Sequence, residues 1–305
     1  VYQTLDEHPQ RRALIDQLGY GRDDRRLPDL VLPVYDAIRC RVDPKGWMAQ
    51  CMDAYSFADN TPAEQTIWGR ALIASLSRVL ESAERNLNDA LRLMDGDESL
   101  QISYAPLFTE NRRAVAALRE CTAWDEIYER RTLDFGRLRP VRKPQDAERQ
   151  ERAKALREAA KETVKDALKP FYAPSARVMG DLKYSASAIG GLLELVQMFE
   201  TRYTQEKRRR KLFDFSVLEH ETIRLLVQKQ SGKPTAVARE ISQRYREILV
   251  DEYQDSNAVQ ECIFEAVSRD GTNRFMVGVV KQSIYRFRLA DPGIFLQKYA
   301  RYPLY

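Results

Sequence analysis

Three carboxylates follow an apolar run in the C-terminal third of this sequence. The run at residues 248–250 ends at Asp251 and Glu252, and Asp255 comes three residues later. An ionised carboxylate at the end of a buried strand loses hydration, and that loss must be offset by a partner. The spacing therefore raises the question of what these acids hold.

The elements around the acids indicate how they are positioned. Two β-like runs, "EILVD" at 247–251 and "RFMVGVV" at 274–280, flank a helical pattern at 256–270. Strand, helix, strand is the order typical of a parallel sheet. Ligands of such sheets bind at the carboxyl ends of the strands, which is where Asp251 and Glu252 are expected to lie.

Two neighbouring acids at that point suit nucleotide hydrolysis. Asp251 can hold Mg²⁺ through its water shell, and Glu252 can orient or deprotonate a water that attacks a terminal phosphate. This is the Walker B arrangement, so ATP and Mg²⁺ are the expected cofactors. Apolar residues followed by Asp-Glu are also a common string. The alternative is a surface turn with acidic residues after an edge strand.

A longer string is more specific than the two acids. "VDEYQD" at 250–255, followed by "FMVGVVKQSIYRFR" at 275–288, resembles motifs II and III of superfamily 1 DNA helicases of the UvrD/Rep type. The resemblance implies that Gln282 contacts the terminal phosphate of ATP. It also implies contacts with single-stranded DNA from Tyr285, Phe287 and Arg288. Base stacking on such aromatic rings gives roughly 1–3 kcal/mol per base. The alternative for the two aromatic residues is core packing.

Further text narrows the family. "FETRYTQEKRRRKLFDFSVLEH" at 199–220 and "KQSIYRFRLADPGIFLQKY" at 281–299 look like the AddA-type chain of the AddAB helicase/nucleases, RecBCD-like enzymes of double-strand-break repair. The resemblance implies a helical 1B-like subdomain at 1–210 and part of a RecA-like 1A subdomain at 211–305. The expected fold class is therefore α/β, mostly α, with a parallel sheet of the P-loop NTPase type. A second helicase/nuclease subunit is the expected protein partner.

Helical patterns dominate the N-terminal two thirds of the chain. The clearest helix is expected to begin after Thr61 as N-cap, with Glu64 completing a capping box. Apolar residues then recur at helical spacing. Another long helix is expected at 187–210, and a loop at 136–144.

Basic residues are concentrated between Arg130 and Lys169. There 13 Lys and Arg accompany 7 Asp and Glu, in a chain of net charge +4. Such a patch is typical of a nucleic-acid binder, and the resemblance implies contact with duplex DNA ahead of the unwinding junction. For residues 144–169 the alternative is a solvated helix face with intrahelical pairs such as Glu148 and Arg152.

Composition excludes other classes of chemistry. The chain has two histidines and four widely spaced cysteines without a C-x-x-C pair, so a zinc site, a disulfide framework and histidine-based nucleophilic catalysis are not expected. Mean hydropathy is −0.53 and no apolar run reaches membrane-spanning length, so no membrane partner is expected. We expect a cytoplasmic protein.

The Walker A loop is missing from the pattern. The nearest text, "QSGKPT" at 230–235, has Val227 where the first glycine should stand and Pro234 where Ser or Thr should follow Lys233. We interpret it as a turn. The chain also begins without Met, and we expect that both ends are cut from a longer protein and that this fragment alone is inactive as an ATPase.

Two further departures keep other functions open. The family's usual acid in motif III is replaced by Val279, and another acid is replaced by Val217. One alternative is a non-catalytic DNA-binding or scaffolding module with a relic ATP site. Another is a UvrD-like translocase without a nuclease.

Overall fold

The computed structural model describes residues 8–19, 27–141, 146–282 and 290–301. The chain divides into two compact units, residues 54–184 as one and residues 1–53 with 185–305 as the other. The described parts are mostly helical with one two-stranded parallel sheet, which confirms the expected fold class. None of the described helices combines the length and apolar character needed to cross a membrane.

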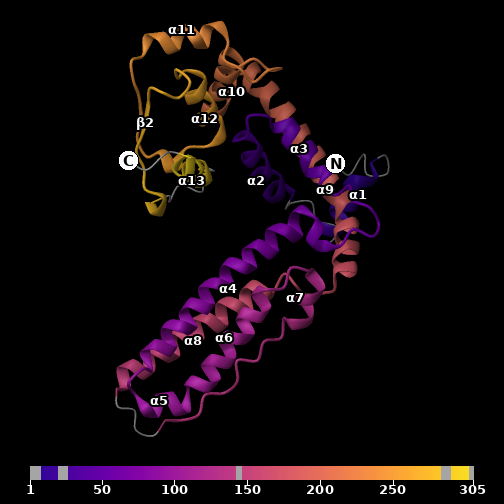
Figure 1. Cartoon of the computed structure of the whole chain (residues 1–305). Helices are drawn as coiled ribbons and strands as arrows, with labels where there is room; N and C mark the ends of the chain where they lie inside the picture. The colour runs from indigo at the N-terminus through magenta and orange to yellow at the C-terminus, as the bar shows by residue number, and fades with distance from the viewer. Residues whose placement is uncertain (1–7, 20–26, 142–145, 283–289, 302–305) are drawn as a thin grey trace. The chain divides into compact units, whose positions relative to one another are not determined.

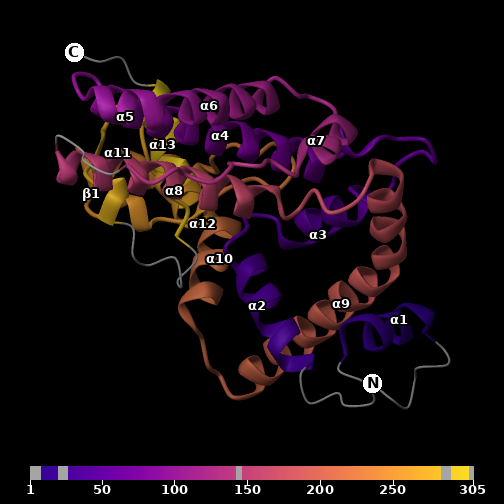
Figure 2. The same ribbon diagram turned by 90° about the horizontal axis from the view of Figure 1, so that it is seen from below.

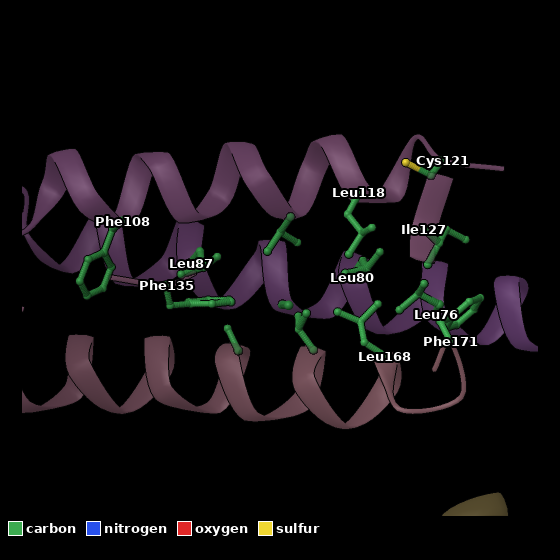
Figure 3. Close-up of a cluster of buried hydrophobic side chains, with 14 of the residues drawn as sticks. Leu76, Leu80, Leu87, Phe108, Leu118, Cys121, Ile127, Phe135, Leu168 and Phe171 are labelled. Carbon is green, nitrogen blue, oxygen red and sulfur yellow. The ribbon is translucent and has the colours of Figure 1, made fainter. Parts of the chain in front are cut away.

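The unit formed by residues 54–184, here unit 2, is an elongated helical bundle (Figure 1). Its long helices α4, α6 and α8 pack along one another, as both views show (Figure 2). Leu87, Phe108 and Leu168 lie between them in a dry core (Figure 3). The helices of this unit are α4 (Ile67–Leu93), α5 (Glu98–Ser103), α6 (Ala105–Arg119), α7 (Trp124–Arg130), α8 (Ala147–Leu168) and the start of α9 (Ser175–Arg209).

The start of α4 differs from the prediction. Thr66, not Thr61, is the N-cap, and its hydroxyl accepts a hydrogen bond from the Gly69 amide at 3.0 Å. Residues Ala63–Gln65 form a short 3₁₀ helix instead of the first turn of α4. The predicted capping box is wrong because Glu64 accepts a bond from the Trp124 amide, at 3.4 Å, rather than capping its own helix.

An extended segment, residues 131–141, connects α7 to the chain before α8. Extended backbone in this stretch therefore begins before the loop predicted at 136–144. Its apolar side chains pack onto the bundle core: Leu133, Phe135, Leu138 and Val141. Phe135 lies between α6 and α8 (Figure 3). Apolar burial and not helical propensity holds this segment in place.

The other unit, unit 1, contains a helical part and the sheet. In the helical part, Leu14, Ile38 and Met48 pack against Val196 of α9, and α1 lies beside α9 (Figure 2). Its elements are α1 (Pro9–Leu18), α2 (Leu27–Arg39), α3 (Pro44–Asp53), the rest of α9, α10 (Phe215–Leu226), α11 (Ala236–Arg244), β1 (Ile248–Val250), η3 (Tyr253–Asp255), α12 (Ala258–Ala266), β2 (Arg274–Met276), η4 (Val280–Gln282) and α13 (Pro292–Arg301).

Helix α9 joins the two units as one continuous helix of 35 residues. It begins at Ser175, earlier than the predicted residue 187. Because α1, α2 and α3 pack on its second half, residues 1–53 group with 185–305. The division of the folded chain thus differs from the sequence-based boundary between 210 and 211, which falls inside unit 1. The assignment of 1B and 1A to the two units stays a prediction.

The substitution Leu87→Ala tests the bundle core. Leu87 is fully buried, so truncation should lower the free energy of unfolding of unit 2 by about 2–5 kcal/mol. Urea denaturation followed by fluorescence of the buried Trp124 measures this. Ile67→Ala, on a largely exposed side chain of the same helix, is the control. An equal effect of both substitutions would contradict the described packing.

Candidate functional site

The two strands of the sheet are adjacent and parallel, as the sequence predicted. Ile248 pairs with Arg274 and Val250 with Met276. Their carboxyl ends therefore meet at one edge. Hydrogen bonds continue past the strands, because the Val277 amide donates to the Val250 carbonyl at 2.9 Å and the Tyr253 amide donates to the Val277 carbonyl at 2.8 Å.

Asp251 and Glu252 lie at that edge, and both are exposed. The Asp251 carboxylate accepts a hydrogen bond from the Glu252 amide at 2.8 Å. Glu252 has φ +50°, a left-handed conformation that is uncommon outside glycine. Lys211 and Asp270 share it, so the conformation alone does not mark a site. Here it turns the chain directly from β1 into η3.

Gln254 links the acidic loop to the second strand, and it is absent from the predicted site residues. Its side chain is almost fully buried. Its Nε2 donates to a Glu252 carboxylate oxygen at 2.5 Å, and its Oε1 accepts from the Val279 amide at 2.9 Å. A buried amide side chain needs such partners. The signal in the sequence was a glutamine inside a tight turn directly after a strand, where only buried partners could satisfy it.

Gly278 permits this close approach. A Cβ built there would lie 2.3 Å from Gln254 Oε1 and 3.2 Å from the Tyr253 amide nitrogen. A side chain at this position would therefore displace the Gln254 amide that holds the carboxylate of Glu252. Glycine is required here by space, not by its backbone angles.

A buried acid supports the loop from below. Glu261 of α12 pairs with Arg274 of β2 at 3.1 Å and with Lys298 of α13 at 2.5 Å. The hydroxyl of Tyr253, which is buried, also donates to Glu261. Removing one member of a buried charged group is strongly destabilising. The network therefore fixes Tyr253, the residue between Glu252 and Gln254.

Gln282 ends η4, five residues after Val277 of the interstrand ladder. Its amide donates to the Val279 carbonyl at 2.8 Å and its side chain is exposed. The chain thus leads from the Val277–Val279 backbone, which is bonded to the acidic loop, directly to Gln282. The predicted DNA-contacting residues Tyr285, Phe287 and Arg288 lie outside the described residues.

Residues 82–303 match the family described as the UvrD/REP helicase N-terminal domain. The match covers well over half of the chain. The chain belongs to the UvrD/REP helicase family.

Curated relatives are similar over nearly the whole chain, and each is named as the A chain of an "ATP-dependent helicase/nuclease". That of Moorella thermoacetica is 36% identical over 301 residues, which cover 95% of this chain and 21% of that protein. The same-named protein of Pelotomaculum thermopropionicum is also 36% identical, over 95% and 24%. That of Acetivibrio thermocellus is 34% identical, over 98% and 25%. The chain thus spans a quarter or less of the length of these relatives.

Within this family, the stretch 230–235 is the nearest text to a phosphate-binding loop, and the structure makes it a turn, as predicted. The Gln228 amide donates to the Lys233 carbonyl at 2.9 Å, and Val227 bridges to Pro234. Gly232 has φ +65°. The turn leads into α11, whose N-cap is Thr235. A helix and not a strand precedes it, unlike a Walker A loop.

The donors at the strand edge fit a magnesium ion only in part. Asp251 presents an exposed carboxylate oxygen, which suits a hard cation. Among the described residues, no group of three or more His, Cys, Asp or Glu side chains is placed to hold a metal. The residues present therefore fit a cation held mainly by phosphate oxygens and water, with one protein carboxylate beside it.

Both valines that replace family acids lie where the backbone does the bonding. The Val279 amide is the group that binds Gln254, and its side chain is half exposed. The Val217 amide donates to Asp214, the N-cap of α10, at 2.8 Å. Neither contact needs an acidic side chain. The missing acids therefore leave the local fold intact.

Asp214 is also held by a buried lysine. Lys207 Nζ lies 2.7 Å from its carboxylate and 4.4 Å from the centre of the Tyr203 ring. Partial burial would raise the pKa of Asp214, but the hydrogen bonds from Lys207 and the Val217 amide outweigh it and lower that pKa below its ordinary value. The ion pair fixes the start of α10 against the end of α9.

One face of the sheet is bare, which corrects the expectation of a buried strand. Leu249 and Phe275 pair across the strands and are 70% and 62% exposed. Ile248 and Val250 point to the other, half-buried face. Parallel sheets are normally covered on both faces. The strand is therefore one-sided among the described residues.

The substitution Gly278→Ala should disrupt the edge. The added Cβ clashes with Gln254, so we expect a loss of about 1–3 kcal/mol in unfolding free energy. Chemical denaturation measures it. The control is Gly180→Ala in α9, where nothing lies within 4 Å of the new Cβ and a gain of roughly 0.5–1 kcal/mol is expected. A silent Gly278→Ala would contradict the close approach.

His220 of α10 gives unit 1 a pH dependence. Its Nε2 donates to the Arg39 carbonyl at 2.9 Å. Burial lowers the pKa of His220 below its ordinary value of 6.5, although that carbonyl and the charges of Glu200 and Glu219 oppose the shift.

Below pH 6.5 the unfolded chain therefore takes up the proton first, and stability is lost as pH falls toward the folded pKa. We expect the Tm of wild type to fall relative to that of His220→Gln between about pH 7.5 and 5.5, a range set around the ordinary histidine pKa. Thermal unfolding at several pH values measures the difference. Parallel curves for the two proteins would refute the assignment.

Proposed function

We propose that this chain forms part of the motor of an ATP-dependent DNA helicase. The observation that carries the proposal is the parallel strand edge, where the acidic loop and the backbone before Gln282 share hydrogen bonds. The whole protein would couple hydrolysis of ATP to movement along single-stranded DNA and to separation of the duplex. The name of the relatives, which is that of a helicase/nuclease chain, supports a nuclease, a second subunit as partner and a role in double-strand-break repair.

The edge residues would divide the chemistry between them. Glu252 would accept a proton from, or orient, the attacking water. Gln254 holds one oxygen of that carboxylate, which leaves the other available to the water. Asp251 would stand beside Mg²⁺, which supplies charge neutralisation on the phosphates when bound. Gln282 would contact the terminal phosphate.

The hydrogen-bond pattern supports a coupling route. Glu252 is bonded to Gln254, and Gln254 to the Val279 amide. A change at the terminal phosphate would alter Gln282, three residues after Val279. Tyr285, Phe287 and Arg288 follow within six residues of Gln282, so nucleotide state and DNA contact would be linked through a short stretch of chain.

The site needs a phosphate-binding loop that residues 230–235 do not supply. We therefore propose that these 305 residues alone hydrolyse no ATP above background. The whole protein would provide the loop. A DNA-stimulated ATPase in the isolated chain would contradict this.

A relic site in a DNA-binding module is the second candidate, and Val279 favours it. The test is Glu252→Gln in the whole protein. If Glu252 activates water, kcat for DNA-stimulated ATP hydrolysis should fall about 10²–10⁴-fold, with a smaller change in KM. The matched control is Glu247→Gln, the same charge change on an exposed residue before the amino end of β1. A wild-type rate in Glu252→Gln would support the relic.

A further inference from the structure

The charges of α8 are largely neutralised within the helix. Its lysines and arginines pair with acids three residues away, as the alternative drawn from the sequence anticipated: Arg149 with Asp146, Lys154 with Glu151, Lys161 with Glu158, and Lys169 with Asp166 just after the helix end. Such exposed pairs leave little net charge for a partner. The positive excess of residues 130–169 must therefore lie elsewhere.

It lies in part on the 131–141 segment. Phe135 and Leu138 face the core, whereas Arg137 and Arg139 are exposed. Within the parts of the chain that the structure describes, neither arginine has an acidic partner. Two residues apart in extended backbone, their Cα atoms are separated by roughly 6.6 Å. The segment thus presents two free guanidinium groups side by side.

A buried arginine fixes this segment to the bundle. Arg157 of α8 is 4% exposed. Its Nη2 donates to the carbonyls of Phe135 and Gly136, the latter at 2.9 Å, and its Nε donates to Asn111 Oδ1 at 2.9 Å. Asn111, also buried, donates in turn to the Phe135 carbonyl at 3.1 Å.

These contacts place a charge in the interior without a carboxylate. Burial lowers the pKa of Arg157, and three oxygens replace the lost water. The rings of Phe108 and Phe135 lie 5.6 and 5.7 Å from the guanidinium carbon, within the range of cation–π attraction. The cost of burying this group is offset only if the 131–141 backbone stays in place. The contact is therefore specific for one path of that segment.

The bend at Gly136 directs the two arginines outward. Gly136 has φ +67°, and its amide donates to Asp134 at 2.7 Å. A Cβ at Gly136 would lie 2.8 Å from Leu107 of α6. Both the angle and the space require glycine there. The segment changes direction at this residue, immediately before Arg137.

We infer that Arg137 and Arg139 form a phosphate-binding element for the backbone of duplex DNA, and that Arg157 is its positioning residue. The inference rests on the proposed DNA-binding function and names the element of unit 2 that contacts the duplex. Guanidinium forks bind phosphate oxygens in pairs. Contacts of this kind fix orientation without reading sequence.

The test is the salt dependence of duplex binding by the 305-residue chain. Fluorescence anisotropy with a labelled blunt duplex gives the affinity at several KCl concentrations. Each lost phosphate contact reduces the slope of log K against log salt by about 0.9. The double variant Arg137→Gln/Arg139→Gln should reduce it by about 1.8 with an unchanged Tm. Lys161→Gln/Lys169→Gln removes the same charge from α8 and should leave the slope unchanged.

The outcomes separate the DNA role of unit 2 from the role of the two arginines. A wild-type chain that binds no duplex would refute the proposed DNA role of unit 2. A wild-type chain that binds with a steep slope, which the arginine variant keeps, would refute this element alone. Equal slope loss in the two double variants would mean general charge attraction and would also overturn the assignment. Preference for an acidic peptide over DNA would overturn it in favour of a protein partner.

Arg157→Met tests the positioning role. With the segment released, the salt slope should fall as in the arginine double variant, and trypsin should cleave faster after Arg137 and Arg139. Cleavage after Arg152 in α8 is the internal control. Unchanged cleavage at the segment, or a wild-type salt slope, would overturn the positioning role. Should Arg157→Met fail to fold, the double variant still decides the inference.

Discussion

The candidate site depends on two parallel strands of three residues each, whose hydrogen bonds extend beyond the strands into the acidic loop. The amides of Val277, Tyr253 and Val279 bind in turn to the Val250 carbonyl, the Val277 carbonyl and the Gln254 side chain. Backbone groups at a strand end need partners when they are buried. Here those partners come from the opposite strand, so Glu252 and the chain before Gln282 are held together.

Support from outside the strands makes this arrangement rigid. Glu261 binds groups on β2, α13 and η3, and Gly278 leaves the space that Gln254 occupies. Unit 2 uses the same principle, since a buried polar side chain, Arg157, fixes an irregular segment by binding its carbonyls. In both units a buried polar group with satisfied hydrogen bonds selects one backbone path.

Local patterns predicted the strands, their parallel pairing, the position of Asp251 and Glu252 and the turn at 230–235, because each depends on neighbouring residues. Contacts between distant residues could not be read in this way. Thr66 replaced Thr61 as a cap because Glu64 binds a residue 60 positions away. Residues 1–53 joined the second half of α9 through Leu14 and Val196. Gln254 acquired its role only when both strand ends were in place.

The central claim is that the acidic loop and the second strand share one hydrogen-bond ladder, and amide hydrogen exchange tests it most directly. The account predicts that the amides of Tyr253, Val277 and Val279 are all protected. In Gln254→Leu, Val279 should lose protection by far the most, because its bond to the side chain is the one removed. Free exchange of the Tyr253 and Val277 amides in wild type, or full protection of Val279 in Gln254→Leu, would contradict the account.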